Sequence, residues 1–188
     1  MQFLPHDSAC RATQYFAFRS AALELWGEFG WREVEENLPD DTRATLFTKP
    51  PAPIDWVLER HMMSLSEAVF AGPAGRREEV YRHFVATMID CGFGRIRRFL
   101  VQFAPPELLL ERAPDLWRHD HTHGELRVKL ADKRATVELH DHVHTTTSLS
   151  RLTAAEAFRC ALSSTRAREV KVEHELVSDA LEIRLRWS

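Results

Sequence analysis

The spacing of apolar residues divides the chain into two parts with different periodicities. In the first part, apolar side chains recur every three or four residues, as at Leu58, Met62, Leu65 and Val69, which places them on one stripe of a helix. A proline-rich connector follows the first such segment at 48–54. The pattern predicts helices over about residues 13–29, 58–69, 76–91, 95–103 and 106–117, and so a helical part over about 12–117.

The second part has the period of two that is typical of strands. Apolar and polar residues alternate over about 117–130 and again over 135–146, and a turn at Asp132 and Lys133 separates the two runs, which predicts a β-hairpin. A second hairpin is predicted over 170–176 and 181–187. Apolar residues face each other when paired residue numbers sum to 265 in the first hairpin and to 357 in the second. Between the hairpins, Thr153 and Glu156 have the spacing of a capping box and predict a short helix.

This order of elements predicts an α+β fold in which N-terminal helices are followed by a ββαββ antiparallel sheet. The sheet part covers about residues 117–188, and we expect helices to cover one of its faces. With 188 residues, of which 44% are hydrophobic, the chain is long enough to bury a core, and we expect a single domain over 1–188.

Composition indicates the cellular compartment of the protein and the classes of partner that it lacks. A formal net charge of −3 provides no field that would attract nucleic acid. No uninterrupted apolar run approaches the roughly 20 residues of a membrane helix, and the N-terminus lacks the pattern of a signal peptide, so we expect no membrane insertion. Three widely separated cysteines, Cys10, Cys91 and Cys160, indicate a reducing environment. The sequence therefore predicts a cytoplasmic protein without a nucleic-acid partner.

Histidine is concentrated in one stretch of the first predicted hairpin. If paired residue numbers sum to 265, His121 lies opposite His144 and His123 lies opposite His142 on one face. Imidazoles in such an arrangement could share zinc, copper, nickel or iron. The same face also carries Glu125, so a solvent-exposed surface or an interface is an open alternative. The candidate metal ligands are His119, His121, His123, His140, His142 and His144.

The opposite face of this hairpin carries polar residues that we expect to point toward the helices. Buried carboxylates are costly unless they are paired, so three alternatives are open. These residues line a polar ligand pocket, lie in water at strand ends beyond the core, or pair with arginines such as Arg95, Arg97 or Arg98. His174 lies on the apolar face of its strand, where a hydrogen-bonded core histidine is favoured over a ligand-binding residue. The candidate pocket residues are Asp120, Thr122, Asp141, Thr145 and His174.

Three segments carry a resemblance to known domains. They are GFGRIRRFLVQFAPPELLLERAPDLWRHDHTHGELRV, AEAFRCALSSTRAREVKVEH and the terminal LEIRLRWS. Over about residues 15–188 the chain resembles a myxobacterial paralogous domain family of unknown function. Its element order is similar to that of the superfamily of haem nitric-oxide-binding domains, 4-vinyl-reductase-type ligand-binding domains and vesicle-tethering subunits. The resemblance implies a regulatory module that binds a small ligand or dimerises.

Two observations narrow this expectation. The haem-binding branch is marked by a Tyr-x-Ser-x-Arg arrangement in the sheet, whereas the only tyrosines here, Tyr15 and Tyr81, fall in predicted helices, so the sequence argues against haem. No nucleophile elbow, P-loop or dinucleotide fingerprint is present. We therefore expect a non-catalytic, sensor-like module that binds a ligand or a partner protein and self-associates as a homodimer. The alternative is a metalloprotein or metalloenzyme with a transition metal at the histidines and Glu125 or Asp141 as base.

Overall fold

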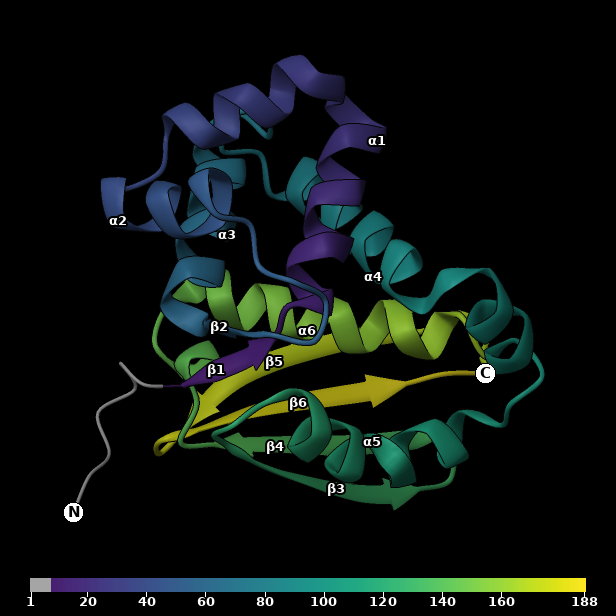
Figure 1. Cartoon of the computed structure of the whole chain (residues 1–188). Coiled ribbons are helices and arrows are strands. Elements are labelled where there is room, and N and C mark those ends of the chain that lie inside the picture. Colours follow the sequence, from purple (N-terminus) through teal and green to yellow (C-terminus); the bar gives the residue numbers. More distant parts are fainter. Residues whose placement is uncertain (1–7) are drawn as a thin grey trace. The chain divides into compact units, whose positions relative to one another are not determined.

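A computed structural model describes residues 8–188, except for the side chains of residues 94–100 (Figure 1). The chain comprises two compact units, Met1–Gly92 and Phe93–Ser188, which are described separately below as unit 1 and unit 2. The expectation that they form one domain stays a prediction.

Unit 1 consists of helices and a small two-stranded sheet. Strands β1 and β2 pair antiparallel, with Cys10 opposite Val57. Helix α1 is kinked at Gly27, whose φ of 64° is readily adopted by glycine. Helix α4 begins in unit 1 and continues beyond Gly92. The elements are β1 (Ala9–Arg11), α1 (Thr13–Glu36), α2 (Asp40–Arg43), the π-helix η2 (Ala44–Thr48), β2 (Trp56–Leu58), α3 (Glu59–Ala71) and α4 (Glu78–Val101).

Helix α4 differs from the sequence prediction. Two helices separated by a break at residues 92–94 were expected, but α4 is continuous from Glu78 to Val101. A glycine inside a helix costs only about 1 kcal/mol relative to alanine. A Cβ atom at Gly92 would lie 3.5 Å from the Cβ atom of Ala17, so this position belongs to the packing of α4 against α1 within unit 1. No helix in the described part of the chain is both long and apolar enough to cross a membrane.

Aromatic side chains form the centre of unit 1. The rings of Phe18 and Phe84 meet edge to face at 4.7 Å, and Trp26 stacks on Phe84 at 5.4 Å. The buried Tyr15 donates a hydrogen bond from its hydroxyl to the backbone oxygen of Leu46 at 3.0 Å. This bond fixes the π-helix η2 to α1.

A buried polar pair, Thr42 and His61, joins α2 to α3. The Thr42 hydroxyl and His61 Nδ1 lie 2.8 Å apart, and His61 is only 3% exposed. Burial lowers the pKa of His61 below its ordinary value, and the nearby Arg60 lowers it further, while Asp41 raises it by a smaller amount. The imidazole is therefore neutral near pH 7.

The depressed pKa of His61 makes unit 1 sensitive to acid. Because the folded-state pKa lies below the unfolded value of about 6.5, this contribution to stability is complete above that pH and is lost as the pH falls below it. The slope for one proton reaches about 1.4 kcal/mol per pH unit. Urea denaturation at several pH values should show a smaller loss of stability on acidification for His61→Gln than for the parent. The exposed His119→Gln is the control, and equal losses in all three proteins would contradict the prediction.

Unit 2 contains the sheet and two helices that pack on it. The strands lie in the order β3-β4-β6-β5, and all neighbours are antiparallel. Leu126 pairs with Leu139 and Val172 pairs with Leu185, so both predicted registers are confirmed. The elements are α5 (Pro106–Asp120), β3 (Glu125–Ala131), β4 (Arg134–His140), the 3-10 helix η3 (Val143–Thr145), α6 (Ser148–Ser163), β5 (Lys171–Val177) and β6 (Ala180–Arg186).

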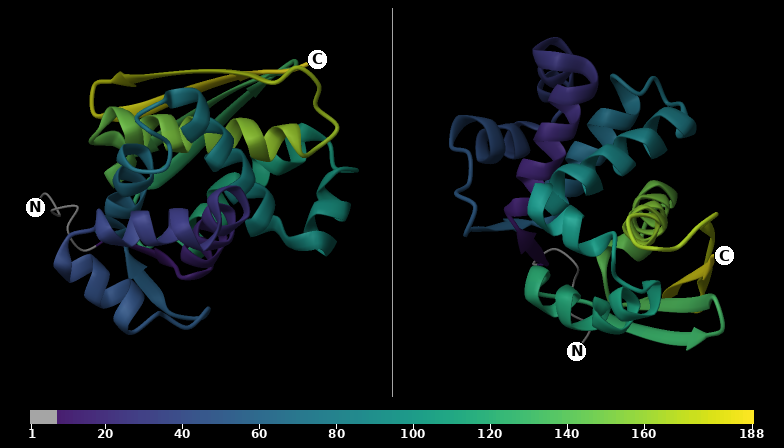
Figure 2. Two further views of the ribbon diagram at one scale, coloured as in Figure 1. Left: turned by 90° about the horizontal axis from the view of Figure 1, so that it is seen from above. Right: turned by 90° about the vertical axis from the view of Figure 1, so that its right-hand side faces the viewer.

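One face of this sheet forms the core of unit 2. Val137, Leu139 and Ile183 are fully buried on it, together with Leu110 from α5 and Leu162 from α6. Figure 1 shows α5 lying along β3 and β4, and α6 lying along β5 and β6; Figure 2 gives the same arrangement from two other directions. The predicted α+β fold, with a ββαββ sheet that helices cover on one face, is confirmed.

The elements that flank β3 and β4 differ from the prediction. Residues 117–120 belong to α5, and β4 ends at His140, so the hairpin is shorter than the alternation indicated. Helix α6 begins earlier than predicted: its capping box is formed by Thr147 and Ser150, whose side chains each bond the backbone N–H of the other. The histidine-rich stretch therefore lies mostly in the segments that connect α5 to β3 and β4 to α6.

Candidate functional site

Three histidines gather on Trp117 at the end of α5 in unit 2. The His121 ring stacks on Trp117, with centroids 3.9 Å apart and planes inclined by 8°. The His142 ring meets Trp117 edge to face at 4.7 Å and lies 5.2 Å from His121. His144 lies 4.9 Å from His142 and 6.3 Å from Trp117. We call Trp117, His121, His142 and His144 the histidine–tryptophan cluster.

Local backbone structure brings these residues together. The N–H of His121 bonds the carbonyl of Trp117 at 2.8 Å as α5 ends, which places the two rings on one side of the helix terminus. The indole Nε1 of Trp117 donates to the carbonyl of His123 at 3.2 Å and holds the following loop. After β4, Asp141 has a positive φ of 51°, so the strand alternation stops there. His142 is consequently buried, with 3% exposure.

The hydrogen bond that His142 makes determines its tautomer. Its Nδ1 atom accepts the backbone N–H of His144 at 3.2 Å and caps the 3-10 helix η3. A neutral imidazole that accepts at Nδ1 carries its proton on Nε2. A metal bound at Nε2 would require the proton on Nδ1, which would break this cap. In this conformation His142 is a structural residue, because its ring caps η3, whereas the rings of His121 and His144 do not form that cap.

The other predicted histidine ligands lie outside the cluster. His119 is highly exposed, and its Nδ1 lies 2.8 Å from Oδ1 of Asp120. His123 Nδ1 lies 2.9 Å from the Thr122 hydroxyl. His140 ends β4 opposite Glu125, whose pKa is lowered mainly by its hydrogen bonds with Arg127 and to a smaller extent by His140. The structure thus brings together three of the six candidate metal ligands.

The five candidate pocket residues do not come together in one place. Asp120 bonds His119, and the exposed Thr122 bonds His123. Asp141 is exposed at the turn after β4, and Thr145 donates from its hydroxyl to the carbonyl of His142 at 2.8 Å. The fifth residue, His174, is half-buried in β5 opposite Ile183.

The role of Trp117 was not foreseen from the sequence. The sequence pattern places Trp117 at the boundary between a helix and a strand, so it does not indicate to which side the Trp117 side chain points. The spacing of four residues between Trp117 and His121 was the available signal, because residues i and i+4 lie on one side of a helix. A tryptophan followed by a histidine at this spacing indicates ring contact if the helix continues that far.

Comparisons with known proteins identify the fold. No family model matches the chain, and no curated protein matches it. An Fe(II) unliganded H-NOX protein from K. algicida matches at a TM-score of 0.67 and 7% identity, over 95% of this chain and 96% of that one. An H-NOX protein from S. oneidensis in the Fe(II)NO ligation state matches at 0.67 and 11% identity, over 95% and 99%. The chain has the fold of these H-NOX proteins.

These neighbours correct the expectation about haem. The sequence argued against haem because the Tyr-x-Ser-x-Arg arrangement is missing. A further match is described as "Modulating Heme Redox Potential Through Protein-Induced Porphyrin Distortion", at a TM-score of 0.60 and 13% identity over 94% of this chain and 99% of that one. Because solved proteins of this fold are described with iron(II) and haem, the argument against haem from one missing motif was wrong.

Gly124 is a sensitive position for the cluster. Its φ is +87°, and a Cβ atom added there would lie 2.9 Å from Cδ2 of the buried His142 ring. We expect Gly124→Ala to lower the free energy of unfolding by about 1–3 kcal/mol because of backbone strain and the displaced imidazole. Urea denaturation measures this change, and histidine NMR signals should show that His142 has lost its defined tautomer.

Gly92→Ala is the matched control for this substitution. Gly92 lies inside α4, where an added Cβ would make only an ordinary contact at 3.5 Å. Alanine there should leave stability unchanged or raise it by up to about 1 kcal/mol. An equal response to both substitutions would show that Gly124 has no special relation to His142.

Proposed function

We propose that this chain is a non-catalytic sensor module. An imidazole of the histidine–tryptophan cluster would hold an iron atom, and the iron would bind a small ligand. The observation that carries the proposal is the convergence of His121 and His144 on Trp117, in a fold whose solved examples are described with Fe(II) and with NO on Fe(II). A histidine holds the haem iron in globins and peroxidases. Haem is therefore the form of iron that we favour.

The residues of the cluster fit this chemistry in their donor type. His142 holds its proton on Nε2 through the cap on η3, so His121 or His144 would supply the nitrogen that holds the iron. Bound haem supplies an iron atom that can take a diatomic gas. Trp117 restricts the His121 ring by stacking on it, which reduces the entropy lost when that imidazole is held in one orientation.

Titration of the purified protein with hemin tests the proposal. We expect one haem per chain, a sharpened Soret band and spectra typical of imidazole ligation. Either His121→Ala or His144→Ala should lose that spectrum, because the nitrogen that would hold the iron is removed, and free imidazole should restore it.

His119→Ala is the control for the haem titration. His119 is a histidine of the same helix terminus, but its side chain is 73% exposed and bonded to Asp120. It should keep the spectrum of the parent protein. Haem uptake below one per chain, or an equal effect of the cluster and control variants, would contradict the proposal.

A second candidate function follows from the short distances between the imidazole rings. Three rings with neighbouring centroids 4.9–5.2 Å apart also suit a transition-metal ion bound without haem, as the sequence suggested for zinc, copper, nickel or iron. Metal analysis of untagged protein and thermal melts with each metal distinguish the two cases. A metal ion present at 100 times its Kd stabilises the folded protein by about 2.7 kcal/mol. A stoichiometric metal without a Soret band would support this second function and reject the first.

The remaining expectations from the sequence stay predictions. They are the resemblance to the myxobacterial paralogous family, self-association as a homodimer or with a partner protein, and a cytoplasmic location.

A further inference from the structure

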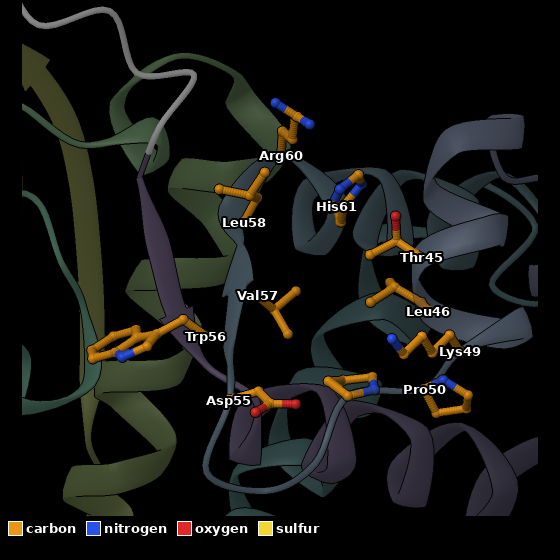
Figure 3. Close-up of a pocket in the computed structure, with 11 residues that line it drawn as sticks. Thr45, Leu46, Lys49, Pro50, Asp55, Trp56, Val57, Leu58, Arg60 and His61 are labelled. Carbon is orange, nitrogen blue, oxygen red and sulfur yellow. The ribbon is translucent and has the colours of Figure 1, made fainter.

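Unit 1 contains a pocket that is independent of the histidine–tryptophan cluster. It has a volume of about 500 Å³ and opens between the π-helix η2 and strand β2 (Figure 3). This volume falls within the range of small-molecule sites, about 300–1,000 Å³. All the lining residues fall between Thr45 and His61, so one short segment of the chain builds the whole pocket.

The middle of the pocket is apolar. Leu46 and Val57 are buried, and Figure 3 shows them facing each other from η2 and β2. The wider turn of a π-helix is uncommon and is found frequently at functional sites. Pro50 and Pro51 add apolar, conformationally rigid surface. These walls suit an aliphatic group.

His61 supplies a hydrogen-bond donor at one end of the pocket. Its Nδ1 atom lies 2.8 Å from the Thr42 hydroxyl, whereas that hydroxyl lies 3.5 Å from Oδ1 of Asp41. A neutral imidazole can accept the Thr42 hydroxyl proton at Nδ1, and this is the tautomer used in the proposal below. The neutral imidazole then carries its own proton on Nε2, which can donate to an acceptor in the pocket.

The charges around the pocket favour an anion. Lys49 and Arg60 line it, and Figure 3 shows the Lys49 side chain extending toward the β2 wall. Neither side chain has an ion-pair partner among the residues that the structure describes. The single acidic lining residue, Asp55, already accepts the N–H of Ala52 at 2.7 Å. The lining therefore has a net positive charge when His61 is neutral.

We propose that this pocket binds a small aliphatic monocarboxylate. Leu46 and Val57 contact its hydrocarbon part. The Nε2–H group of His61 and the ammonium group of Lys49 bind its carboxylate. This binding activity is separate from the proposed iron site, because the two sites share no residue.

Amide chemical shifts of the whole chain, measured during titration with hexanoate, test the proposal. Hexanol and hexylammonium have the same hydrocarbon part with a neutral or positive end. We expect hexanoate to shift the amides of residues 44–61 and to bind about ten-fold more tightly than hexanol, because a charge-assisted hydrogen bond contributes on the order of 1.4 kcal/mol or more. Hexylammonium should bind more weakly than either.

Two exposed lysines allow a matched pair of variants. Lys49→Gln should lower the affinity for hexanoate by about ten-fold and leave that for hexanol unchanged. Lys171→Gln, on strand β5 of unit 2, removes the same charge outside the pocket and should have no effect. Equal affinities of hexanoate and hexanol, equal effects of the two variants, or the absence of shifts at residues 44–61 would each overturn the proposal. Haem uptake is measured separately, so failure of one proposal leaves the other intact.

Discussion

Exclusion of water from one face of the β3-β4-β6-β5 sheet is the constraint on which unit 2 depends. Val137, Leu139, Leu181 and Ile183 are fully buried on that face and require helices over both hairpins. Helices α5 and α6 both pack on that face, α5 over the β3-β4 hairpin and α6 over the β5-β6 hairpin. Because α5 lies along β3, its last turn ends beside the end of β4. Trp117 and the histidines that follow β4 are brought together by this packing.

The candidate site is therefore a product of where regular structure ends. Strand alternation alone would have kept residues 140, 142 and 144 on the charged face of the sheet. The positive φ of Asp141 interrupts that alternation, and the 3-10 helix that follows redirects the chain. The buried His142 serves as the cap of this helix. In this site the backbone is ordered by the cap on η3, whereas His142 and His144 lie beyond the end of β4 and do not follow the alternation of a strand.

The elements that could be predicted are those with long, regular patterns. Both hairpin registers followed from the apolar pairs, because a slip of one residue would have exposed every one of them. The start of the hairpin could not be predicted, because residues 118–125 contain no apolar side chain whose period would distinguish a helix from a strand. The three-histidine grouping depends on one φ angle at Asp141, and aspartate adopts either sign there without leaving a trace in the sequence. The π-helix η2 has only five residues, which are too few to show a repeating pattern of apolar positions, so the sequence could not predict it either.

The cap at His142 would limit how the proposed site could hold iron or another metal. Its Nδ1 accepts the His144 amide, so ligation through Nε2 costs that hydrogen bond, a net loss of about 0.5–1.5 kcal/mol, together with the order of the first turn of η3. Ligation through His121 or His144 involves no such loss at His142. His144 is nevertheless coupled to the cap, because its own backbone N–H forms the bond. His121, which follows α5 and rests on Trp117, is the cluster imidazole that can bind a ligand with the least change to η3.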